Sequence, residues 1–180
     1  MKKLILTFAL GVACASAFAQ GQLNFSNFGS GANAPWFDTD GTTKLAGAAF
    51  QADLYWAAGT VTDSTLLQAL GAPANFASSG YFLGGSRTIA GQTGTITGQV
   101  RVWDTAHGSS WLQASTAQGA RVGESALFQI SLTQPPTTPN SLTGLNGQTL
   151  TLRLVGVPEP STLALAGLGF AGLLVLRRRK

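Results

Sequence analysis

The sequence predicts an all-β protein, with a single antiparallel domain of sandwich or barrel-like form flanked by two short terminal segments. Apolar and polar residues alternate with period two in several central segments, and stretches rich in Gly, Pro, Asp and Ser separate them. We find no repeat of fixed period, which argues against a solenoid or propeller. A chain of 180 residues has room for one modest core. The predicted parts are 1–19, 20–156 and 157–180.

Five strands are expected in the central part, at 22–28, 50–56, 95–102, 128–132 and 149–154. In the second of these, Phe50, Ala52, Leu54 and Trp56 share one face, which predicts that this face is buried. A short helix is expected at 110–118, with Ser109 or Ser110 as its N-cap and Gly119 as its end. Residues 66–70 are expected to form a single turn and 134–140 a loop.

The net charge of +4 comes from the two ends of the chain. Six of the eleven basic residues lie among the first three and last four positions, which leaves five basic against six acidic side chains between Gln20 and Val157, a net charge of −1. A nearly neutral body without a basic stripe lacks the surface that phosphate-backbone binding requires. Nucleic acid is therefore not expected as a partner.

The first nineteen residues have the pattern of a signal peptide. Two lysines precede an apolar run at 4–13, and Ala17-Phe18-Ala19 is an A-x-A site at which signal peptidase would cut after Ala19. One alternative is an uncleaved anchor, although the apolar run is short for a membrane span. Another is lipidation of Cys14, although Gly11 stands where a lipobox has Leu. Cleavage after Ala19 would leave the mature chain without cysteine.

The last residues combine three features in a fixed order. The rigid, extended Pro158-Glu159-Pro160 comes first, followed by an uncharged apolar helix expected at 163–176, and the chain ends in Arg177, Arg178, Arg179 and Lys180. Fourteen helical residues reach about 21 Å, against a hydrocarbon layer of about 30 Å. The basic end should stay in the cytoplasm as a stop-transfer signal, with the body outside.

This tail resembles the PEP-CTERM sorting signal of Gram-negative bacteria. The resemblance implies an inner-membrane exosortase that recognises Pro158, Glu159 and Pro160, removes the tail and passes the protein to the cell surface, often beside exopolysaccharide or biofilm genes. The protein would thus be membrane-anchored only transiently. A plain C-terminal transmembrane anchor is the alternative. The body is more loosely similar to small PEP-CTERM proteins of uncharacterised function, through stretches such as APWFDTDGTTKLAG and QVRVWDTAHG.

The sequence offers little that supports catalysis or metal binding. His107 is the only histidine, with Asp104 before it and Ser109 and Ser110 after it, but no G-x-S-x-G accompanies them. One histidine and no mature cysteine are too few for a zinc site. Asp38-Thr-Asp-Gly-Thr42 begins like a calcium loop, yet Ala49 stands where the loop needs Glu, which favours an Asp-Gly turn. We expect a nonenzymatic body without a cofactor.

Two roles remain for the body. The first is a structural or adhesive component of the envelope or matrix. The second is a carbohydrate-binding module for exopolysaccharide, in which exposed tryptophans stack on sugar rings. Trp56 falls on the apolar face of its strand and is expected in the core, so the candidates for stacking are Trp36, Trp103 and Trp111.

Overall fold

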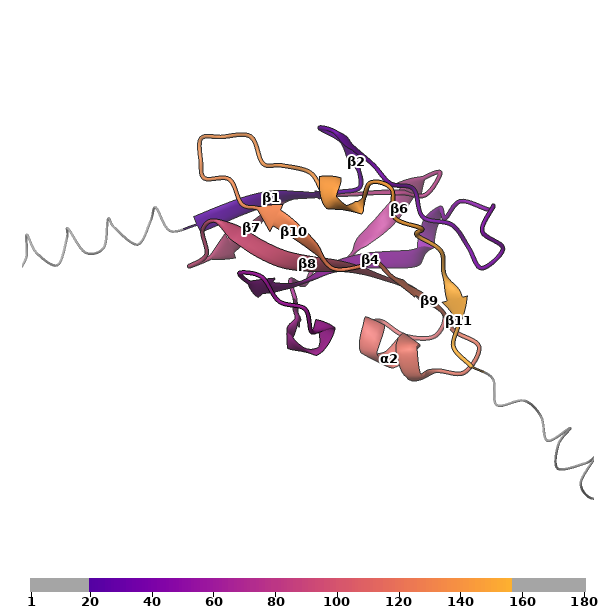
Figure 1. Ribbon diagram of the computed structural model, residues 1–180. Coiled ribbons are helices and arrows are strands. Elements are labelled where there is room, and N and C mark those ends of the chain that lie inside the picture. The colour runs from indigo at the N-terminus through magenta and orange to yellow at the C-terminus, as the bar shows by residue number, and fades with distance from the viewer. Residues whose placement is uncertain (1–19, 157–180) are drawn as a thin grey trace, which may run out of the picture.

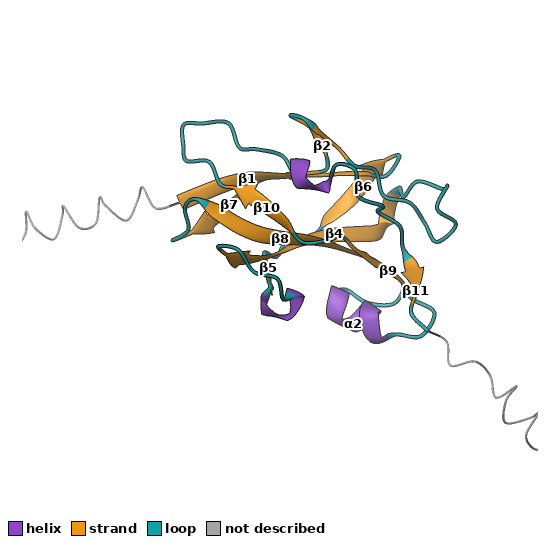
Figure 2. Cartoon of the chain, viewed as in Figure 1, coloured by secondary structure: helices purple, strands orange, loops and turns teal. Residues whose placement is uncertain are grey.

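We describe residues 20–156 from a computed structural model of the chain, which includes the predicted body and neither terminal segment. Strands are the predominant secondary structure of this region, and its one α-helix packs beside β8 and β9 (Figure 2). The elements are β1 (Gln20–Ser26), β2 (Phe28–Gly29), β3 (Ala32–Asn33), β4 (Gly47–Ala58), η1 (Ser64–Leu66), β5 (Gln68–Ala69), β6 (Ala74–Ser78), β7 (Tyr81–Ala90), β8 (Thr95–Asp104), α2 (Trp111–Thr116), β9 (Arg121–Glu124), β10 (Phe128–Ser131), η2 (Thr143–Leu145) and β11 (Arg153–Leu154).

The strands form a nine-stranded sheet and a separate hairpin of β2 and β3. The main path runs β1-β7-β6-β4-β8-β9-β11, while β10 pairs with β8 and β5 with β4. All these ladders are antiparallel, which confirms the predicted class. The longest ladder joins β4 to β8, from Phe50 opposite Asp104 to Ala58 opposite Ile96.

The sheet is not a closed barrel. At its outer edge, β1 meets the chain after β10 at the isolated bridge between Gln22 and Thr133 and through single backbone hydrogen bonds to Asn140 and Leu142. No continuous ladder therefore completes a ring within residues 20–156. The core contains side chains from β1, β6 and β7 together with side chains from β4, β8 and β10, including Phe25, Phe82, Leu54 and Ile130. This arrangement fits a β-sandwich in which the two parts of a bent sheet face one another.

A second apolar cluster covers the opposite face of β8 and β9. It joins Trp103 and Val122 of the sheet to Trp111 and Ala114 of α2. Figure 1 shows α2 on one side of the sheet and the hairpin that begins with β2 on the other. Strand β8 is buried on both faces, where the alternating sequence predicted one wet face. On that second face α2 covers Trp103, while Thr97 contacts Gly59 and Gln99 contacts Ser125.

Four of the five expected strands are found in place. Strands β1, β4, β8 and β10 match the predictions at 22–28, 50–56, 95–102 and 128–132, and α2 begins after Ser110, whose hydroxyl accepts from the Gln113 N–H. The prediction of a full strand at 149–154 was wrong, since only Arg153–Leu154 pairs in a strand. Leu150 and Leu152 are nevertheless buried, because this segment packs beside Phe37 through hydrogen bonds at 2.8 and 3.0 Å.

Four strands of the sheet, β5, β6, β7 and β9, were not predicted. Strands β6 and β7 form a hairpin whose turn residues Ser79 and Gly80 both have positive φ, at 47° and 84°. That conformation is typical of two-residue hairpin turns. A β-bulge opposite Phe25, with its extra residue at Gly84-Gly85 of β7, interrupts the alternation in this region, so the period-two signal is short there. The expected turn at 66–70 is replaced by η1 and β5.

Candidate functional site

The Asp38–Thr43 loop is a tight Asp-Gly turn, as predicted. The Asp38 carbonyl accepts from the Gly41 N–H at 2.9 Å, and Gly41 has φ of 69°. The Asp40 carboxylate accepts from the Thr42 and Thr43 N–H groups and from the Thr43 hydroxyl. These bonds, with the Thr43 hydroxyl first, lower the pKa of Asp40. In the described part of the chain, no three His, Cys, Asp or Glu side chains gather as a metal site would require.

A charged network joins this loop to the end of β8. The buried Asp104 carboxylate lies 2.7 Å from His107 Nδ1 and accepts from the Arg121 N–H at 2.9 Å. The Arg121 guanidinium lies 2.7 Å from Asp38 and 3.5 Å from Asp104, above the Phe50 ring. Burial by itself raises the pKa of Asp104, but the Arg121 N–H and His107 together outweigh it, so that this pKa is lowered.

The network brings Asp104 and His107 together as a catalytic dyad would require, but the two nearby serines are engaged elsewhere. Both the N–H and the hydroxyl of Ser109 donate to Gln113 Oε1, while Ser110 caps α2. Arg121 instead connects the Asp38 loop with Asp104 at the end of β8. The arrangement acts as a clamp between the Asp38 loop, β8 and β9.

The prediction that Trp36, Trp103 and Trp111 form exposed stacking platforms was wrong. Their exposed fractions are 0%, 1% and 8%. Trp36 lies in the main core, and the other two fill the cluster beneath α2. A sugar ring cannot reach the face of a buried indole, so these residues contribute packing instead. Trp56 packs against the main core as expected, although it is only partly buried.

An aromatic pair joins the β2–β3 hairpin to the start of β7. Phe28 is 53% exposed, and its ring centre is 4.9 Å from that of Tyr81, with the planes tilted by 50°. The Tyr81 hydroxyl donates to Asn33 Oδ1 at 2.7 Å. The tilt leaves no common flat face on which a ring could stack, and isolated exposed apolar side chains are common on protein surfaces.

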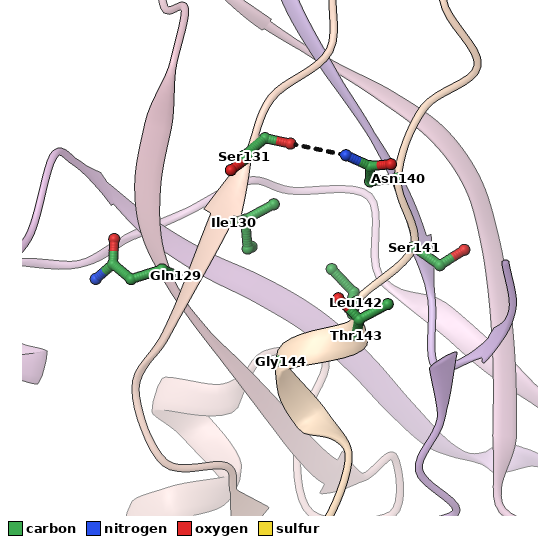
Figure 3. Close-up of a pocket in the computed structure, with 8 residues that line it drawn as sticks. All are labelled: Gln129, Ile130, Ser131, Asn140, Ser141, Leu142, Thr143 and Gly144. Carbon is green, nitrogen blue, oxygen red and sulfur yellow. Dashed lines mark hydrogen bonds between the residues drawn. The ribbon is translucent and has the colours of Figure 1, made fainter. Parts of the chain in front are cut away.

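A polar cavity of about 160 Å³ lies between β10 and the 140–144 segment. Figure 3 shows Ile130 and Leu142 projecting into this space, whereas Gln129 points away from the 140–144 segment. Ser131 and Asn140 meet at one end, where the Asn140 amide approaches the Ser131 carbonyl at 3.4 Å. The remaining lining residues are Ser141, Thr143 and Gly144. The sequence did not predict this cavity, because its two walls are more than eight residues apart in the chain and consist of residue types that are common in loops.

Comparison with known proteins decides the nature of the C-terminal tail. Residues 156–180 match the family model described as the PEP-CTERM protein-sorting motif. This segment is a PEP-CTERM sorting motif. The match confirms the resemblance noted for Pro158, Glu159, Pro160 and the basic end, and it indicates exosortase-dependent sorting of an exported protein. No curated protein and no solved structure matches the chain.

Several predicted features lie outside the described residues. They are the signal-peptidase site at Ala17 and Ala19, the PEP-CTERM motif itself, the apolar helix at 163–176, and the basic end at 177–180. Among helices of the described region 20–156, none is long and apolar enough to cross a membrane.

Proposed function

We propose that this chain is an exported surface or matrix protein of a Gram-negative bacterium, with a body that is structural or adhesive and not catalytic. The observation that carries the proposal is the PEP-CTERM motif at 156–180, for which an exosortase is the processing partner. In the proposed order of processing steps, signal peptidase first removes residues 1–19, and the tail then holds the protein transiently in the inner membrane. Exosortase finally releases the body to the cell surface or matrix. Exopolysaccharide is the proposed surrounding there.

Both proposed cuts are compatible with the described pairings of the body. Within the described residues, Gln20 pairs with Ala90 of β7, on the body side of the proposed cut after Ala19. At the other end, Val155 donates to the Ala120 carbonyl at 2.8 Å, three residues before Pro158. Cuts after Ala19 and at the motif would therefore leave the described strand pairings intact.

The geometry of the clamp supports a noncatalytic body. Asp104 and His107 form the only acid-histidine pair of the described residues, and the neighbouring hydroxyls of Ser109 and Ser110 are committed to Gln113 and the α2 cap. Nucleophilic catalysis by a serine needs the serine hydroxyl within hydrogen-bond reach of a general base. The pair is better explained by its contacts with Arg121.

Processing is tested by intact-mass and C-terminal peptide analysis of protein from the host's surface and medium fractions. Wild-type protein should begin at Gln20 and end near Pro158 to Pro160. Glu159→Ala, or deletion of the exosortase, should leave Arg177 to Lys180 attached. The matched control is Glu124→Ala, which removes an exposed glutamate from β9 and should be processed normally. Wild-type protein that retains the tail in an exosortase-positive host would contradict the proposal.

The noncatalytic role is tested by complementation. A host lacking this chain should lose surface or matrix cohesion and recover it with the wild-type protein. His107→Gln should restore cohesion equally, because in this proposal the pair with Asp104 only positions Arg121. Circular dichroism spectra establish that the variant is folded. A folded His107→Gln protein that fails to restore cohesion would show that the imidazole has a chemical role.

A further inference from the structure

The cavity between β10 and the 140–144 segment lies where the sheet is left open. Strand β10 pairs with β8 along one edge, from Phe128 opposite Gly98 to Ser131 opposite Thr95. On the other side of β10 lies the 140–144 segment, here called the returning segment, and the cavity lies between this segment and β10. The opening is therefore a consequence of the topology, because β10 and β1 are joined only near Thr133.

The returning segment is held firmly against β1. The Asn24 N–H donates to the Asn140 carbonyl at 2.8 Å, and the Leu142 N–H donates to the Ser26 carbonyl at 3.1 Å. The Asn24 side chain also donates to the Ser141 hydroxyl at 2.9 Å. These bonds hold the wall of the cavity in place before any ligand arrives, which lowers the entropic cost of binding.

The lining of the cavity is mainly polar, with a small apolar floor. Ile130 and Leu142 are almost completely buried and form the floor. At the rim, the hydroxyls of Ser131 and Thr143 make no hydrogen bond with another residue of the described region, and the Asn140 amide has only the long contact to Ser131. Hydroxyl and amide groups both donate and accept, so the rim offers both kinds of partner.

Charged side chains are absent from the sequence on both sides of this cavity. No Asp, Glu, Lys, Arg or His occurs from Ser125 to Leu152, which includes every lining residue, or from Gln20 to Phe37, which includes β1 and the β2–β3 hairpin. A site without charge selects neither anions nor cations. It also disfavours a purely apolar ligand, which would bury the rim groups without hydrogen bonds.

We propose that this cavity binds one ring of a neutral saccharide. A sugar ring presents apolar C–H groups to the floor and hydroxyls that donate to and accept from Ser131, Asn140 and Thr143. A cavity of about 160 Å³ is smaller than the roughly 300–1,000 Å³ of sites for drug-sized ligands, so it takes one unit of a chain and leaves the others outside. The inference concerns the folded body, and it holds whether or not exosortase removes the tail.

The test is titration of the exported protein, purified from its host, with neutral oligosaccharides of glucose, galactose, mannose and N-acetylglucosamine, followed by NMR and calorimetry. We expect at least one of them to shift the amide signals of β10 and of residues 140–144. The double variant Ser131→Ala/Asn140→Ala should bind about tenfold more weakly, because two neutral hydrogen bonds are lost. Thr143→Ala should weaken binding by a smaller factor.

Two controls make the assignment specific. Asn75→Ala/Ser78→Ala removes the same two side-chain types from exposed positions of β6 and should bind as wild type does. Phe28→Ala removes the exposed aromatic ring outside the cavity and should also bind as wild type does. Binding lost in Phe28→Ala but kept in Ser131→Ala/Asn140→Ala would overturn the assignment. So would the absence of saccharide-induced shifts at the cavity, or shifts there with extended peptides alone.

Discussion

The buried side chain of Asn27 accepts a hydrogen bond at its Oδ1 from the backbone N–H of Phe82, at 2.8 Å. Its Nδ2 donates to the carbonyls of Ala34 and Gly80, at 2.7 and 2.9 Å. A single amide thus connects the end of β1, the strand-like segment before Trp36 and the turn between β6 and β7. All three of its hydrogen bonds are shielded from water, which makes each of them costly to lose.

Asn27→Ala should strongly destabilise the body. It leaves the Phe82 N–H and the Ala34 carbonyl buried without partners, whereas the Gly80 carbonyl keeps its bond from the Trp36 N–H. Two unpaired groups by themselves cost about 2–5 kcal/mol in the free energy of unfolding. Urea denaturation followed by tryptophan fluorescence measures the change. Asn75→Ala, at an exposed position of β6, is the matched control and should change stability by less than about 0.5 kcal/mol. Equal effects of the two substitutions would refute the role given to Asn27.

Trp36 should tolerate Phe better than Ala. Its indole Nε1 is buried and has no hydrogen-bond partner in the described region, so replacing the indole by a phenyl ring also removes an unpaired donor. We expect a loss of about 1–2 kcal/mol for Trp36→Phe and about 3–5 kcal/mol for Trp36→Ala. Thermal and urea unfolding of both variants provide the measurement. A similar loss in both would mean that the indole nitrogen has an important partner.

Gly123→Ala should clash with the same tryptophan. A Cβ at this position of β9 would lie 2.7 Å from Trp36 Cζ3 and 2.8 Å from Leu152 Cδ2. Overpacking of this kind costs about 1–3 kcal/mol. The phenyl ring of Trp36→Phe lacks the atom involved, so the loss should be smaller in the double variant. Additive losses in this double-mutant cycle would exclude the proposed contact.

Asp104 should stabilise the fold most at neutral pH. Its pKa is lowered in the folded state from an ordinary value of 3.8, so its contribution is fully present above that value and is lost as the pH falls through the lower folded pKa. The difference in unfolding free energy between wild type and Asp104→Asn should therefore be largest near pH 7 and shrink below about pH 4. Urea unfolding at a series of pH values tests this, and a difference independent of pH would contradict it.

Asp53 should show the opposite sign. Burial raises the pKa of this carboxyl above 3.8, so the folded state holds its proton more tightly than the unfolded chain does. Stability linked to Asp53 is then present at acid pH and lost as the pH rises through the folded pKa. Asp53→Asn should be at least as stable as wild type at pH 7, and this advantage should disappear in acid. A large loss of stability at pH 7 would show that the carboxylate is strongly paired.

Repeating local patterns were enough to predict the class of the fold and most of its central strands. The alternation in β4 and β10 reflects burial of one face, which is a property of each strand by itself. The same alternation located β8, although both of its faces are buried. Bulges and glycines break this alternation in β7, and β9 is only four residues long, so neither was predicted. The tail was recognised for a related reason, since its motif, apolar run and basic end are contiguous in the chain.

Contacts between distant segments decided the rest. Whether a tryptophan faces water depends on what covers its strand, and α2 covers Trp103 from beyond the end of β8. The Asp104–Arg121–Asp38 clamp likewise joins positions up to 83 residues apart. The cavity between β10 and the 140–144 segment exists because these two segments are placed side by side by their separate partners, β8 and β1. The sequence by itself determined the periodicity of the strands and the terminal sorting signal. Which strand faces are covered by other segments, and where the sheet stays open, depend on how distant segments pack, and only the tertiary structure decided them.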